Sequence, residues 1–181
     1  QWQNTELRDL LVELERESGR DLSHWSKLWL ETAGVNTLKP EIEETYGKIS
    51  SFKVIQTTQE GHDYQRPHRM GIGFFSLESG KLKRTHHLEL DIDGPETEVA
   101  ELHGMTRPDL VLLNDADLAY AKVRLDEPSR LVAMENLSGI EDSLARTLVW
   151  TAAWDATRDG EAPARDFIKL VLRHIASETE S

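Results

Sequence analysis

The sequence lacks cysteine and has no long apolar run. Without cysteine, its 181 residues contain no disulfide bond, no thiolate nucleophile and no cysteine-ligated zinc. The absence also favours a reducing compartment, so we expect a cytoplasmic protein. Apolar runs such as Leu110–Leu113 suit one buried strand, whereas a membrane-spanning helix needs roughly 20 apolar residues. We therefore expect no membrane partner.

Positive charge is also scarce. The chain has 21 Lys and Arg against 33 Asp and Glu, which gives a formal net charge of -12. Nucleic-acid binding depends on cations that contact phosphate groups, so this balance argues against a nucleic-acid partner. With 38% hydrophobic and 30% charged residues, the composition is that of a globular protein. The N-terminus does not resemble a signal peptide, and Gln1 is not a natural start residue, so we expect a fragment.

The first 34 residues carry the pattern of a helix pair. Apolar residues of the first helix follow the 3.6-residue period at Leu7, Leu10, Leu11 and Leu14. Asn4 or Thr5 is its predicted N-cap, and Gly19 ends it. The second helix is predicted to begin between residues 21 and 23 and to end at Gly34.

Between residues 35 and 127 the apolar period changes from 3.6 to 2. Several short alternating runs, the last over 119–125, are separated by turn signals such as Ser79-Gly80 and no helical pattern intervenes. This arrangement predicts an antiparallel β-sandwich. Its predicted core includes Phe52, Val54, Ile72, Phe74, Leu90, Ile92, Leu112 and Val123.

Helical spacing returns from residue 128. A short helix is predicted to open at Pro128-Ser129, and Ser138 with Glu141 forms a capping-box pattern before a longer helix. Asp159-Gly160 is expected to break that helix, and Pro163 to open a last one. One face of the last helix is marked by Ala164, Phe167, Ile168, Val171, Leu172 and Ile175.

These zones predict an α+β chain of several parts, in which an antiparallel β-sandwich is flanked by an N-terminal helix pair and C-terminal helices. The expected units are residues 1–34, 35–127 and 128–181. The first and last units each resemble the edge of a larger helical body, whose apolar faces would be left uncovered. We therefore expect self-association through the exposed helices.

The sequence offers no convincing catalytic or metal-binding constellation. A zinc peptidase needs two His at i and i+4 on a helix with a Glu between them, and no HExxH occurs. The seven histidines are His24, His62, His68, His86, His87, His103 and His174. His86 and His87 are neighbours in an expected strand, so they point to opposite faces. We predict no catalytic, cofactor-binding or metal-binding residue in this chain.

Weaker patterns have structural explanations. The pairs Asp91/Asp93 and Asp115/Asp117 lack the distal Glu of a calcium loop and are typical of turns. Gly71-Ile72-Gly73 lies inside a strand pattern, where a close backbone approach or a bulge is expected. Four tryptophans at helical spacing are expected to pack between helices, namely Trp25, Trp29, Trp150 and Trp154.

Several stretches, in order, resemble zinc aminopeptidases of the M1 (aminopeptidase N) family. They are 4–11, 18–26, 29–38, 66–69, 89–94, 107–126, 141–146 and 154–159. The resemblance implies the close of a catalytic domain, a whole sandwich domain and the opening of a C-terminal helical domain. It also implies a zinc-dependent exopeptidase whose metal and catalytic residues lie before Gln1. Met134-Glu135-Asn136 lacks the glycines that precede the family's amine-binding loop, so that role is not assigned to it.

Three functions remain open. The chain can be a non-catalytic spacer of an aminopeptidase, with zinc only in the parent and the missing catalytic and C-terminal domains as its partners. It can instead be an independent acidic β-sandwich module that binds a protein or a carbohydrate. A small enzyme in its own right has least support. An HExxH upstream in the reading frame would favour the first, and a start codon near Gln1 the second.

Overall fold

The strands are the framework of the molecule in the computed structural model, which describes residues 4–178. They are β1 (Thr37–Thr45), β2 (Lys48–Thr57), β3 (His68–Glu78), β4 (Lys81–Ile92), β5 (Glu96–Glu98), β6 (Leu110–Leu113) and β7 (Lys122–Val123). A four-stranded sheet has the order β5-β2-β1-β7, and a three-stranded sheet the order β4-β3-β6. All pairs are antiparallel except β1 with β7, which is parallel.

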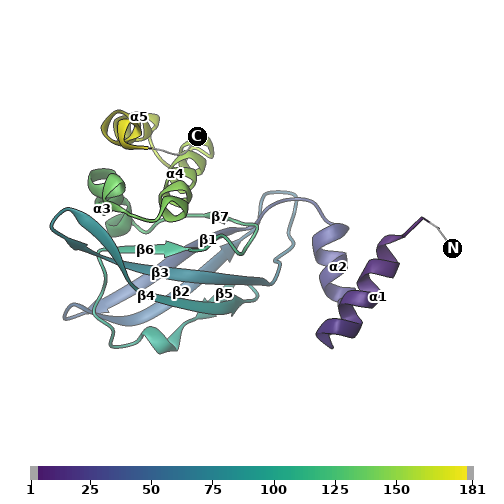
Figure 1. Ribbon diagram of the computed structural model, residues 1–181. Coiled ribbons are helices and arrows are strands. Elements are labelled where there is room, and N and C mark those ends of the chain that lie inside the picture. The colour runs from purple at the N-terminus through teal and green to yellow at the C-terminus, as the bar shows by residue number, and fades with distance from the viewer. Residues whose placement is uncertain (1–3, 179–181) are drawn as a thin grey trace.

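Helices lie beyond one end of the two sheets and over one face of them, as Figure 1 shows. The N-terminal pair, α1 (Leu7–Ser18) and α2 (Ser23–Leu30), lies beyond one end of the sandwich. The C-terminal set comprises α3 (Glu127–Asn136), α4 (Ser143–Arg158) and α5 (Ala164–His174). It covers the outer face of the three-stranded sheet, so that sheet is the middle of three layers (Figure 1). The predicted α+β class is confirmed.

Two apolar cores follow from this layering. The first lies between the sheets and contains the predicted Phe52, Val54, Ile72, Phe74, Ile92 and Val123, with Leu90 partly buried beside it. The second joins the three-stranded sheet to the helices and contains Leu112. The prediction that Leu112 faces the sandwich core is therefore wrong. All four residues of β6 are buried, so the continuous apolar run gives no alternation to tell its two faces apart.

Turn chemistry is well predicted, whereas capping is not. Ser79-Gly80 connects β3 to β4 with positive φ at both residues, as a tight hairpin requires. Gly19 ends α1 in the left-handed conformation. The cap of α1, however, is Glu6, whose side chain forms a reciprocal capping box with Asp9. The cap of α4 is Asp142 rather than Ser138, because the Asp142 carboxylate accepts from the backbone N–H groups of the first turn.

The segment 119–121 is the main departure from the predicted strands, because it continues the loop that begins at the predicted turn of Asn114 and Asp115. Of the alternating run 119–125, only Lys122 and Val123 form a strand. Asn114, Ala116 and Asp117 instead adopt positive φ, and the Asn114 side chain accepts from Ala119 N and donates to Ala119 O. Asn and Asp tolerate this conformation because their side chains hydrogen-bond locally. A compact loop therefore replaces the strand while Ala119 and Ala121 still pack against the first core.

Candidate functional site: polar joints between the sandwich and the helices

The histidines lie apart in the structure. His86 stacks on Phe74 with ring centroids 5.5 Å apart, whereas His87 Nε2 lies 3.4 Å from Asp115 O, so the neighbours do point to different sides. His174 is buried against Ser138 and Met134, and His103 contacts Glu98. Within residues 4–178, no three His, Asp or Glu side chains are grouped so that they could hold a metal ion. The polar side chains that do gather connect the helices to the sandwich.

Arg66 is the centre of an N-terminal joint, the contact between α2 and the sandwich. Its side chain is almost fully buried and donates to the carbonyl groups of Leu28 and Ala33 at 3.0 Å and to the hydroxyl of Thr32. These groups lie at the C-terminal end of α2, where the helix dipole is negative and favours a cation. The guanidinium carbon also lies 5.5 Å from the Trp29 ring centroid. A strand-side arginine therefore caps the preceding helix.

A chain of polar contacts adjoins Arg66 in the same joint. His68 Nε2 lies 2.9 Å from Gln56 Oε1, and Gln56 Nε2 donates to Gly94 O at 2.8 Å. The His68 ring meets Trp29 edge-on, with centroids 5.3 Å apart. Burial, helped by the nearby Arg66 charge, lowers the pKa of His68 to about 4. His68 is therefore a neutral, buried side chain at ordinary pH.

Arg84 begins the C-terminal joint, the set of ion pairs between the sandwich and α3–α5. Its Nη2 donates to Asp115 Oδ1 at 2.8 Å and to Asp142 Oδ2 at 2.7 Å. Asp115 Oδ2 lies 2.7 Å from Arg84 Nε but accepts no well-aligned hydrogen bond from the described residues. Asp142 also accepts a hydrogen bond from Arg84, and this bond holds the pKa of Asp142 below its usual value although burial raises it. One arginine thus links a buried loop carboxylate to the N-cap of α4.

Two glycines in β3 make room for Asp115. A Cβ at Gly73 would lie 2.3 Å from Asp115 Oδ2, and a Cβ at Gly71 would lie 2.3 Å from Asp115 O. No side chain can occupy either place without moving the loop. The predicted close backbone approach at Gly71-Ile72-Gly73 is confirmed, and a register shift follows directly between Phe74 and Phe75.

Arg124 holds the other end of α4. Its Nη2 donates to Asp159 Oδ2 at 2.6 Å, and its Nε donates to Glu161 Oε2 at 2.8 Å. Lys122 Nζ also lies 2.6 Å from Asp159 Oδ2. Hydrogen bonds from Lys122 and Arg124 lower the pKa of Asp159, and the bond from Arg124 lowers that of Glu161. α4 is therefore tied to the sandwich at both ends.

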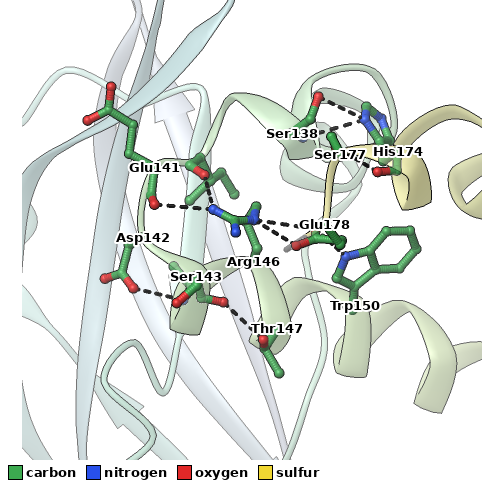
Figure 2. A network of polar contacts seen from close by, with 12 residues as sticks. Ser138, Glu141, Asp142, Ser143, Arg146, Thr147, Trp150, His174, Ser177 and Glu178 are labelled. Carbon is green, nitrogen blue, oxygen red and sulfur yellow. Dashed lines mark hydrogen bonds and ion pairs between the residues drawn. The ribbon is translucent and has the colours of Figure 1, made fainter. Parts of the chain in front are cut away.

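A third set of contacts fixes the C-terminal segment on α4, as Figure 2 shows. Arg146 Nε donates to Glu178 Oε2 at 3.0 Å, and its Nη1 donates to Ile140 O at 2.8 Å. Trp150 Nε1 donates to the other Glu178 oxygen at 2.8 Å. Although burial opposes it, these hydrogen bonds lower the pKa of Glu178. Trp150 and Trp154 also contact Phe167 of α5, as expected for tryptophans between helices.

Sequence reasoning did not single out the arginines of the two joints. Arg66 lies in the stretch 66–69 and Arg124 in the stretch 107–126, both of which carry the aminopeptidase resemblance. Their side chains are at least nine-tenths buried, which is rare for arginine without partners. A buried arginine cannot be recognised from local periodicity, because its partners lie 33 to 38 residues away.

Comparisons with known proteins show what the sequence of this chain is similar to. The family described as the ERAP1-like C-terminal domain matches residues 110–181, which include β6, β7 and α3–α5. The match therefore begins inside the sandwich and contains most of the C-terminal joint. Aminopeptidase N of Streptomyces lividans is 50% identical over 98% of this chain. The chain is therefore similar to a segment of an aminopeptidase N, and the predicted resemblance is confirmed.

The match covers only a small part of the relative. The chain spans 22% of the length of the aminopeptidase N that it resembles. Within residues 4–178, no helix is long and apolar enough to cross a membrane.

Proposed function

We propose that this chain is a non-catalytic spacer in a zinc-dependent aminopeptidase that removes N-terminal residues from peptides. In this role the sandwich fixes the catalytic part before it and the helical part after it in one orientation. The observation that carries the proposal is the pair of arginine joints, one to α2 and one to both ends of α4. Buried, multiply bonded arginines give geometric specificity, because each donor fits only one arrangement of acceptors.

We propose units at 1–34, 35–127 and 128–181 for this spacer. Arg66 then crosses the first boundary, and Arg84 and Arg124 cross the second. Zinc, in this proposal, belongs to the parent enzyme outside these residues. The chemistry of the chain, which has no cysteine, suits a reducing compartment such as the cytoplasm.

The uncovered helix faces support a larger assembly. Leu7, Leu10 and Leu14 of α1 are about half exposed, and α1 has no buried residue. On α5 and directly after it, Ile168, Leu172 and Ile175 are 56%, 78% and 54% exposed. On the opposite side of the helix, Leu170 belongs to the second core and His174 is buried against Ser138 and Met134. Apolar rows of this kind mark contact surfaces. We propose that the remaining parts of the same aminopeptidase cover both faces.

Metal analysis and a turnover assay test the catalytic side of the proposal. After dialysis, residues 1–181 should retain no stoichiometric zinc and should not hydrolyse an aminoacyl amide. Stoichiometric zinc together with turnover would overturn the proposal. Sequencing the reading frame supplies the complementary test, since an in-frame HExxH before Gln1 supports a parent enzyme and a start codon near Gln1 supports an independent module.

A further inference from the structure

The N-terminal joint contains a one-way series of hydrogen bonds. Gly94 O can only accept, so the amide nitrogen of Gln56 must face it at 2.8 Å. The amide oxygen of Gln56 therefore faces His68 Nε2 at 2.9 Å and can only accept. His68 Nε2 must carry a proton, which leaves Nδ1 of the neutral ring as a bare acceptor. Neighbouring groups thus fix the tautomer of His68.

The ring that contacts His68 carries a buried donor. Trp29 Nε1 and His68 Nδ1 are both buried, and neither makes a hydrogen bond to the described residues. The two rings are in edge contact at an interplanar angle of 89°. An indole N–H can only donate, and the fixed tautomer makes Nδ1 an acceptor, so the two unsatisfied atoms are complementary. Leaving both unpaired would carry the desolvation cost of two buried polar groups.

We propose that Trp29 Nε1–H is joined to His68 Nδ1, directly or through one water, and that the series Trp29–His68–Gln56–Gly94 is an acid-sensitive latch between α2 and the sandwich. The latch closes while His68 is neutral. This proposal rests on the geometry of the joint. It goes beyond the proposed spacer role, because the attachment of α2 to the sandwich then depends on whether His68 is protonated.

Protonation of His68 removes the acceptor that the Trp29 indole needs. A proton on Nδ1 turns His68 into a donor at both nitrogens, so it faces the Trp29 donor with no acceptor between them. The other charged group that acts on His68 is Arg66, a cation whose Nη2 holds the end of α2. Adding a second positive charge beside it disfavours the closed joint. The low pKa of His68, about 4, agrees with a site built for the neutral ring.

Imidazole NMR on the unmodified chain tests the tautomer. Long-range proton–nitrogen correlation spectra should show His68 protonated on Nε2 and unprotonated on Nδ1 at pH 7. Exchange of the Trp29 indole proton should be slow, and a cross-peak to a long-lived water would identify the bridged form over the direct one. A proton on Nδ1, or a doubly protonated ring at pH 7, would overturn the proposal.

Hydrogen exchange tests the latch itself. Trp29→Phe keeps an aromatic ring and removes the donor, while Trp25→Phe on the more exposed side of α2 is the matched control. At pH 7, Trp29→Phe should lower the protection of α2 amides roughly tenfold, the size expected for losing one hydrogen bond to a buried acceptor. Trp25→Phe should not change it.

Acid should produce the same effect in the unmodified chain. Protection of α2, corrected for intrinsic exchange, should fall between pH 6 and pH 4 while β2 and β3 stay protected. Equal protection of α2 in Trp29→Phe and the parent chain, or protection that is insensitive to His68 protonation, would overturn the latch. The spacer proposal would survive that result, because it depends on the arginines.

Discussion

Single residues decide most of the stability of the sandwich. Its core side chains are at most 8% exposed, and several buried polar groups, among them Arg66 and Asp115, sit at the two joints. Substitution of an apolar residue and substitution of a polar residue lower stability for different reasons. Loss of an apolar side chain removes contact area and leaves a cavity, whereas loss of a polar partner leaves a desolvated group behind.

Ile92→Ala tests the apolar case. Ile92 is fully buried at the end of β4, so its truncation should lower the free energy of unfolding by about 2–5 kcal/mol. Ile168→Ala is the matched control, because Ile168 is 56% exposed and should change stability by less than about 0.5 kcal/mol. Urea denaturation measures both. Equal effects of the two changes would contradict the assigned burial.

His68 makes stability depend on pH. The ordinary pKa of 6.5 applies to the unfolded chain, and the folded value is about 4. Between these values the unfolded state binds more protons, so stability is fully present above pH 6.5 and falls as the pH is lowered towards 4. The loss in the free energy of unfolding is at most roughly 3–4 kcal/mol, since the pKa falls from 6.5 to about 4 and each pH unit corresponds to 1.36 kcal/mol.

A difference measurement isolates this effect from the many carboxylates. His68→Gln cannot take up the proton, so its free energy of unfolding should vary less between pH 6.5 and pH 4 than that of the parent chain. The two pH profiles should become parallel above pH 7. Parallel profiles throughout would show that His68 titrates alike in the folded and unfolded states.

Among the elements, α4 is bonded to the sandwich by charged groups at both of its ends. Its N-cap Asp142 bonds Arg84, and the residues at its other end bond Arg124 and Lys122. Its buried face consists of Ala145, Val149 and Ala152, which are small side chains. The polar groups at its two ends therefore help to fix the orientation of α4 on the sandwich. α1 is the opposite case, a helix with a capping box and no buried residue.

Arg124→Met should weaken the attachment of α4. Arg124 is 7% exposed, and its removal takes the cation from Glu161 and leaves Asp159 paired with Lys122. We expect a loss of about 2–4 kcal/mol, at or below the cost of breaking a buried pair because Glu161 is 55% exposed. Arg158→Met is the control, since Arg158 is 54% exposed and should cost under about 1 kcal/mol. A comparable loss in both variants would mean that burial does not set the value of the Arg124 pair.

The whole molecule is a sandwich with helices attached at two places. Each attachment uses arginine from a strand or an adjoining loop, and each leaves an apolar helix face on the far side. The molecule therefore has a rigid middle and two uncovered ends. This arrangement agrees with the proposed spacer role, in a chain whose formal net charge is -12.

The isolated chain should associate with itself through the uncovered faces. Fully burying one such side chain contributes roughly 1.5–3 kcal/mol, so rows of three on α1 and α5 favour contact. Charge repulsion opposes it, and added salt screens that repulsion, so association should strengthen as salt rises. Sedimentation equilibrium across salt concentrations measures this.

Surface variants show which face is responsible. Leu10→Lys and Leu172→Lys should each reduce association if their helix takes part. Leu118→Lys, in an exposed loop of the sandwich, is the matched control and should leave it unchanged. A monomer at every salt and protein concentration would contradict the prediction.

The sequence by itself determined the period of each segment, most turns and the α+β class. These are local properties: alternation at Phe52 and Val54, or positive φ at Ser79-Gly80, depends on neighbours in the chain. Only the tertiary structure decided which face of β6 meets the helices, that 119–121 is not part of a strand, and that Asp142 caps α4. It alone also brought Arg66 to α2 and Arg124 to Asp159. The physical reason is that a buried charge is satisfied by partners distant in sequence, and no periodic pattern records which acceptor a donor will meet.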